Sequence, residues 1–175
     1  ELLLNYIVKS VKNKEERRNR YLIPLKYLLC YVENSGLHDI LKLDAAQEAE
    51  FAFLLRKQTE KSNVNATKFI AFCRKTLFLE AKEINWEANV WYVEKLNISP
   101  KRYSLNSTID SFSFLDIRLE GNRKMLQEYM RYIFTVTNLN LGTIRIKQTY
   151  IKEFLRYLEE QEKAILTIDA ISIKE

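Results

Sequence analysis

The sequence predicts an all-α protein in which two helical-bundle units are joined by an irregular, aromatic-rich connector. The 175 residues include only 3 Gly and 2 Pro, whereas all-β folds need many turn residues. Apolar residues also recur with helical spacing, most clearly in TIRIKQTYIKEFLRYL at 143–158. There, Ile151, Phe154, Leu155 and Leu158 fall at i, i+3, i+4 and i+7, so they share one helical face. Thr143 follows a Gly and is expected to cap this helix.

Residues 1–83 are expected to form the first unit from four helices. These cover residues 1–11, a stretch ending near residue 33, 44–57 and 66–82. Asp44 is placed to cap the third helix. Pro24 either lies in the first turn of the second helix or kinks a longer one. Cys30 and Cys73 lie within apolar helical runs, so we expect two buried free thiols in a reducing compartment rather than a disulfide.

Residues 84–120 are expected to be the connector, because their aromatic residues follow no sustained period. Trp86 and Trp91 are interpreted as structural clamps on neighbouring helices, and the alternative is a platform on which nucleic-acid bases stack. Residues 121–175 are expected to form the second unit, with helices from about residue 122 to 136 and over 143–158. A further helix capped by Asp169 would begin near the end of the sequence, so we expect this unit to be truncated and the chain to be part of a longer protein.

Sliding the chain by 126 residues aligns the two units as an internal repeat. Residues 25–33 then fall on 151–159 with matching apolar and aromatic positions. After a one-residue gap, residues 43–45 fall on 168–170. If the repeat is structural, the second unit lacks its last two helices. We then expect the uncovered face either to be covered by the first unit or the connector, or to pair with another copy of the chain.

The charge pattern favours a polyanionic partner. The chain carries 28 Lys or Arg against 23 Asp or Glu, a net charge of +5, with a pI near 9.1. Residues 12–20 hold five basic and two acidic side chains. The helix at 143–158 carries Arg145, Gln148, Lys152 and Arg156 opposite its apolar face. Such charge suits DNA phosphates, although an ordinary solvated face would show a similar pattern.

Several other function classes lack their sequence signals. The sole histidine, His38, is not part of a metal-binding spacing, and no Gly-rich phosphate loop or Ser/His/Asp group occurs. No apolar run reaches the 18 residues of a membrane span. We therefore expect no cofactor, no metal, no small-molecule ligand and no membrane association.

One segment resembles a known family. In tyrosine recombinases, the phage-type integrases, a helix of the core-binding domain carries Thr, then Leu at plus eight, Phe at plus eleven and an aromatic residue at plus fourteen. Here Thr143, Ile151, Phe154 and Tyr157 occupy those positions, after the short polar loop NLNLG. Where the family often has Tyr at plus four, this chain has Lys147. The segments ILTIDAISIKE and VWYVEKL also resemble parts of large integrases, so the resemblance covers residues 85–175.

The resemblance implies a SAM-like core-binding fold and a non-catalytic role in DNA integration and recombination. The family's catalytic His-x-x-Arg motif is missing from this sequence, so we expect no enzymatic activity from the chain itself. The resemblance also implies double-stranded DNA as the partner and a prokaryotic, cytoplasmic location at the nucleoid. A helical protein–protein adaptor and an all-α small-ligand regulator remain as alternatives. The candidate DNA-binding residues are Arg145, Lys147, Gln148, Lys152, Arg17, Arg18, Arg20 and Arg74.

Overall fold

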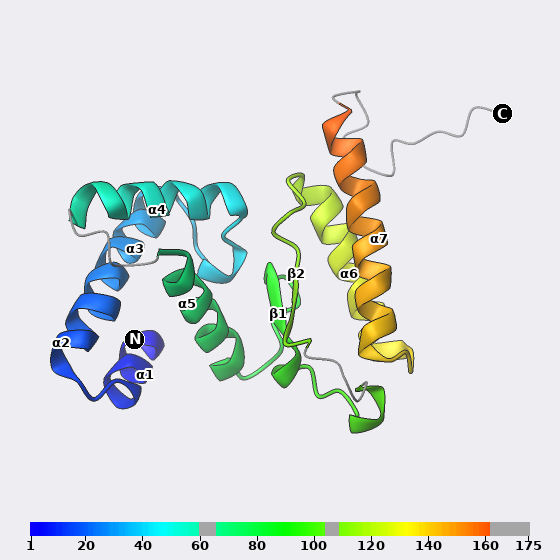
Figure 1. Cartoon of the computed structure of the whole chain (residues 1–175), viewed down its shortest axis with the longest axis horizontal. Coiled ribbons are helices and arrows are strands. Elements are labelled where there is room, and N and C mark those ends of the chain that lie inside the picture. Colours follow the sequence, from blue (N-terminus) through cyan, green and yellow to red (C-terminus); the bar gives the residue numbers. More distant parts are fainter. Residues whose placement is uncertain (60–65, 104–108, 162–175) are drawn as a thin grey trace. The chain divides into compact units, whose positions relative to one another are not determined.

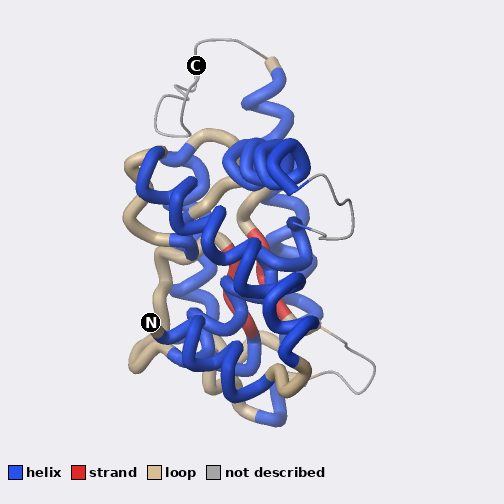
Figure 2. Tube along the Cα trace, turned by 90° about the vertical axis from the view of Figure 1, so that its left-hand side faces the viewer, coloured by secondary structure: helices blue, strands red, loops and turns tan. Residues whose placement is uncertain are grey.

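The computed structural model describes residues 1–59, 66–103 and 109–161. Within these ranges the chain is mostly helical, with one small sheet of two short strands (Figure 2). Contacts between residues divide the chain into Glu1–Glu83 and Ile84–Glu175. The division falls where the sequence placed the end of the first unit. The mostly helical class is confirmed, but the sheet was not expected.

The first unit is built from helices that surround one apolar core (Figure 1). Ile7, Leu28, Phe51 and Ile70 are fully buried there and come from four different helices. The elements are α1 (Leu2–Ser10), α2 (Lys14–Glu16), the π-helix η1 (Arg17–Leu22), α3 (Ile23–Asn34), the 3₁₀ helix η2 (Ile40–Lys42), α4 (Ala45–Thr59) and α5 (Ala66–Glu80).

Local signals in the first unit were mostly reliable. Asp44 and Gln47 form a capping box at the start of α4, each side chain accepting from the other's backbone N–H at 2.9 Å. Pro24 lies in the first turn of α3, and η1 runs directly into that helix. Cys73 is buried, but the expectation for Cys30 was wrong, because Cys30 lies on the exposed side of α3.

The second unit combines a β-hairpin-like pair with a helical pair. Strands β1 (Val90–Tyr92) and β2 (Ser111–Ser113) are antiparallel, with Trp91 opposite Phe112. Their aromatic side chains reach the helical pair: the rings of Phe112 and Phe134 lie 5.0 Å apart, and those of Trp91 and Phe134 lie 6.1 Å apart. The remaining elements are the 3₁₀ helices η3 (Val93–Lys95) and η4 (Pro100–Arg102), α6 (Glu120–Val136) and α7 (Leu141–Glu160).

Residues 84–120 therefore do not act as a connector between two bundles. Trp91, Phe112 and Phe114 are fully buried and form part of the core of the second unit. A pair of amphipathic helices cannot enclose its own apolar faces, so a second layer has to cover them. Here the strands supply that layer. Trp86 packs edge-on against Trp91 at 4.9 Å, which agrees with the structural interpretation of both tryptophans.

Two expectations about α7 were wrong. Asn140, not Thr143, caps the helix: its side-chain oxygen accepts the backbone N–H of Thr143 at 2.8 Å. Leu155 is fully buried as expected, but Phe154 is 47% exposed. Because α7 packs on both α6 and β2, its buried side includes polar as well as apolar residues, and Phe154 lies outside that side.

Burial does not follow the internal repeat. Leu28 is fully buried, whereas its aligned partner Phe154 is exposed, and the neighbouring pair Leu29 and Leu155 shows the reverse. The repeat therefore matches apolar positions without matching the faces that they bury. The expected helix after Asp169 lies outside the described residues. No described helix combines the length and apolar character needed to cross a membrane.

Candidate nucleic-acid interface

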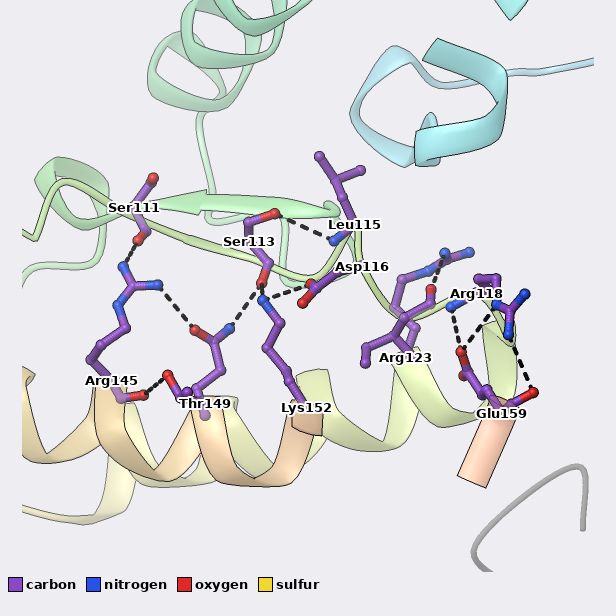
Figure 3. A network of polar contacts seen from close by, with 12 residues as sticks. Ser111, Ser113, Leu115, Asp116, Arg118, Arg123, Arg145, Thr149, Lys152 and Glu159 are labelled. Carbon is purple, nitrogen blue, oxygen red and sulfur yellow. Dashed lines mark hydrogen bonds and ion pairs between the residues drawn. The ribbon is translucent and has the colours of Figure 1, made fainter. Parts of the chain in front are cut away.

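The polar residues of α7 lie against strand β2 rather than facing solvent (Figure 3). We call Arg145, Gln148 and Lys152 the α7 polar row. An Arg145 guanidinium nitrogen donates to the carbonyl of Ser111. Gln148 Nε2 and Lys152 Nζ both donate to the carbonyl of Ser113, at 3.1 and 3.0 Å.

The geometry of the two-stranded sheet explains this arrangement. Along β2, the carbonyl of Asp110 and the N–H of Phe114 bond to the β1 side. Backbone groups alternate in direction along a strand, so the carbonyls of Ser111 and Ser113 face the other edge. Unpaired carbonyls inside a fold are costly. The α7 polar row supplies the missing donors and thereby fixes α7 to the sheet.

Charge interactions reinforce the same contact. Lys152 Nζ lies 2.6 Å from a carboxylate oxygen of Asp116, and its side chain is only 15% exposed. The Arg145 guanidinium lies 4.4 Å from the centroid of the Phe112 ring, which is a cation–π geometry. Burial lowers the pKa of Arg145 from its ordinary value, although an arginine this basic keeps its charge at neutral pH.

These contacts change the assignment of the candidate DNA-binding residues on α7. Gln148 is buried and cannot reach a base edge without leaving the sheet. Arg145 and Lys152 already use their donors on backbone carbonyls and, for Lys152, on a carboxylate. The spacing in the sequence places these three residues on one face, where DNA or solvent was the expected partner, whereas the structure places that face against the carbonyls of β2.

The remaining candidates differ widely in accessibility. Arg74 is buried in the first unit, where it forms an ion pair with Glu48 and donates to the carbonyl of Leu43. It therefore holds α5 against the start of α4 instead of presenting a charge at the surface. Lys147 is partly exposed on α7, away from the polar row.

Several exposed cations lie close together in residues 12–20, which we call the basic segment. Asn13 caps α2 by accepting the N–H of Glu16 at 3.0 Å. Arg17 turns inward, and its Nε donates to the carbonyl of Val11 at 2.8 Å. These two contacts fix the turn between α1 and η1, so the backbone of the basic segment has a defined conformation.

Arg17 therefore acts mainly as an anchor, and its neighbours carry the accessible charge. Arg20 forms a surface ion pair with Glu16 at 3.1 Å and has a side chain that is 71% exposed. Such exposed pairs contribute at most about 1 kcal/mol, so Arg20 can exchange this partner for a phosphate. Within the described residues, no hydrogen bond or ion pair engages the exposed side chains of Lys12, Lys14 and Arg18.

Two charged side chains that the sequence did not single out cap α6 from distant parts of the chain. Glu159 accepts from the backbone N–H groups of Arg118 and Leu119 at 2.9 and 3.1 Å, at the start of α6. At the other end, Arg102 donates to the carbonyls of Phe134 and Leu139 at 2.9 and 2.8 Å. A carboxylate at the N-terminus and a guanidinium at the C-terminus both complement the helix dipole.

Other kinds of site receive little support. In the described ranges, no three His, Cys, Asp or Glu side chains form a group that could hold a metal ion. Hollows of about 240 to 650 Å³ occur on the first unit, but they are open to solvent rather than enclosed. An all-α small-ligand regulator would need an enclosed pocket, so none of these hollows favours that alternative.

Comparison with protein-family models, curated proteins and solved structures gives no significant match.

Proposed function

We propose that this chain binds double-stranded DNA through phosphate contacts of the basic segment, as a non-catalytic part of a tyrosine site-specific recombinase. The observation that carries the proposal is the set of exposed cations on a turn that Asn13 and Arg17 hold in place. The recombinase assignment rests on the sequence resemblance of residues 85–175. The proposal assigns no strand cleavage to the chain, and its expected role is in DNA integration and recombination.

The charges of the first unit support this choice. Residues 1–83 hold 15 Lys or Arg against 11 Asp or Glu, so this unit carries most of the surplus positive charge. Phosphate contacts need mobile cations near the surface and no exact geometry at base edges. Lys12, Lys14 and Arg18 meet that need, whereas the α7 polar row does not.

The proposal predicts a strong salt dependence. If Lys12, Lys14, Arg18 and Arg20 each neutralise one phosphate, log K should fall against log salt with a slope near −3.6, at about −0.9 per contact. Replacing Lys12, Lys14 and Arg18 with Gln should reduce the slope to about −0.9. Fluorescence anisotropy with a labelled 30-base-pair duplex at several salt concentrations measures both values.

A control with the same change in net charge distinguishes two effects: phosphate contacts of the basic segment, and attraction of DNA to the positive charge of the whole chain. Lys26, Arg56 and Lys57 are also exposed in the first unit, and their replacement with Gln removes three charges elsewhere. The control should keep most of the slope. Equal losses in both triple variants, or a flat salt response of the unaltered chain, would contradict the proposal.

A protein–protein adaptor is the second candidate function, and one observation favours it. The second unit exposes large apolar side chains on both α6 and α7, including Tyr132 and Val136 on α6 and Tyr150 on α7. Exposed apolar surface of this kind marks interaction sites. Salt-insensitive binding of a protein, without any binding of DNA, would support this function instead.

A further inference from the structure

An exposed apolar stripe runs along α7 opposite its polar row. Its members are Ile146, Tyr150, Phe154 and Tyr157, at i, i+4, i+8 and i+11, and each is between 47% and 67% exposed. This spacing keeps all four on one side of the helix for about 17 Å, at about 1.5 Å per residue. The inner side of α7 is already occupied by α6 and β2, so the stripe faces away from the core of its own unit.

We propose that this stripe is a homodimer interface in which α7 packs antiparallel against α7 of a second copy. The positions are self-complementary. A two-fold axis that passes midway along the stripe brings Tyr150 of one copy level with Phe154 of the other, and Ile146 level with Tyr157. Two-fold interfaces require this kind of match, because each contact must occur twice with the partners exchanged.

The available area fits a dimer of ordinary size. A fully buried aromatic side chain covers about 150–250 Å². At the exposed fractions above, the stripe and the exposed Tyr129, Tyr132 and Val136 of the neighbouring α6 together offer roughly 700 Å² per copy. Stable interfaces bury about 800 Å² per partner. The stripe with its α6 neighbours is therefore large enough for a specific contact.

The charges beside the stripe favour a second copy over a strongly charged partner. Lys147 and Arg156 are balanced by Glu153 and Glu160 on the same helix. A face with no net charge neither attracts a polyanion nor repels its own copy. The dimer proposal is thus independent of DNA binding, which we assign to cations of the first unit.

The oligomeric state of the full chain tests the proposal. Sedimentation velocity between 1 and 200 μM should show the mass rising from 20.9 kDa toward twice that value. Tyr150→Glu should weaken dimerisation at least about 30-fold, the effect of losing one interface hot spot. Tyr103→Glu is the matched control, since Tyr103 is exposed in the same unit but lies outside α6 and α7. It should leave dimerisation unchanged.

Cross-linking tests the antiparallel register. With Cys30→Ser as the background, Tyr150→Cys protein mixed with Phe154→Cys protein should form a mixed disulfide under mild oxidation. Tyr103→Cys mixed with Phe154→Cys should not. Tryptophan emission should stay unchanged in all variants, which shows that the second unit remains folded.

Three results would overturn the proposal. The first is a chain that stays a monomer at all of these concentrations. The second is a dimer that Tyr150→Glu leaves intact, which places the interface elsewhere. The third is equal cross-linking of the control pair.

Discussion

Removal of the Glu159 carboxylate should strongly destabilise the second unit. Its side chain is only 2% exposed and accepts the backbone N–H groups of Arg118 and Leu119, along with Asn122 Nδ2 at 3.2 Å. Glu159 also lies in the last turn of α7, where the dipole of its own helix disfavours a negative charge. The favourable interaction must therefore come from the start of α6, for which no local side-chain cap exists.

The size of the effect follows from these contacts. Hydrogen bonds to charged groups contribute about 1.5–3 kcal/mol each, and an unsatisfied buried donor costs about 1–3 kcal/mol. Water can replace the contact at the exposed Arg118, so we expect about 3 kcal/mol for Glu159→Ala. Glu159→Gln keeps an acceptor oxygen but loses the charge, so it should cost about half as much, roughly 1.5 kcal/mol.

Tryptophan fluorescence makes the measurement specific to this unit. Both tryptophans of the chain, Trp86 and Trp91, lie in the second unit, and Trp91 is fully buried. Urea titration followed by their emission should show a lower midpoint, and the melting temperature should fall by about 4–8 °C for each kcal/mol. Glu160→Ala is the matched control, because it removes the same charge from an exposed neighbour and should change stability by less than about 0.5 kcal/mol. A Glu159→Ala loss no larger than that of Glu160→Ala would refute the capping role.

Three further outcomes are expected. Arg102→Lys should destabilise the second unit by about 1–2 kcal/mol in the same urea assay, because an ammonium cannot reproduce the forked contacts to two carbonyls. Arg145→Ala with Lys152→Ala should also lower that stability, while DNA affinity, measured where the variant is fully folded, should stay unchanged. A loss of affinity in the folded double variant would return the interface to α7. Burial raises the pKa of Cys73 from 9.0 to about 12, so the unfolded chain loses this proton first. The contribution of the buried thiol to stability is complete below pH 9 and is lost as the pH rises toward 12, by up to about 1.4 kcal/mol per pH unit. Circular-dichroism melts should show this loss in the parent chain and a smaller one in Cys73→Ala.

The helices could be predicted because their signals are local. The capping box of Asp44 and Gln47 spans four residues, and the apolar spacing of α5 and α6 lies within each helix. The strands could not, because each has only three residues, which is too short for an alternating pattern. Their pairing also joins residues about 20 positions apart, and the sequence of one strand alone does not identify the strand with which it pairs.

The same dependence on distant partners explains why the candidate site in the structure differs from the one that the sequence predicted on α7. A row of Arg, Gln and Lys on one side of a helix looks identical in sequence whether it faces DNA or protein backbone. The deciding partners are the carbonyls of Ser111 and Ser113, more than 30 residues earlier in the chain. Every residue has a backbone carbonyl, so no residue type at those positions marks them as acceptors.

The exposed face of α7 follows from the same contact. Once Arg145, Gln148 and Lys152 bind the edge of β2, the direction of the helix is fixed, and side chains about half a turn away must point outward. Tyr150 and Phe154 lie in that direction. Apolar positions that looked like a core in the sequence therefore become surface, because the fold uses polar groups to complete its sheet. The hydrogen bonds of α7 to the edge of β2 thus account for two findings: the α7 polar row is not available as a candidate DNA-binding surface, and the stripe that we assign to a second copy is exposed.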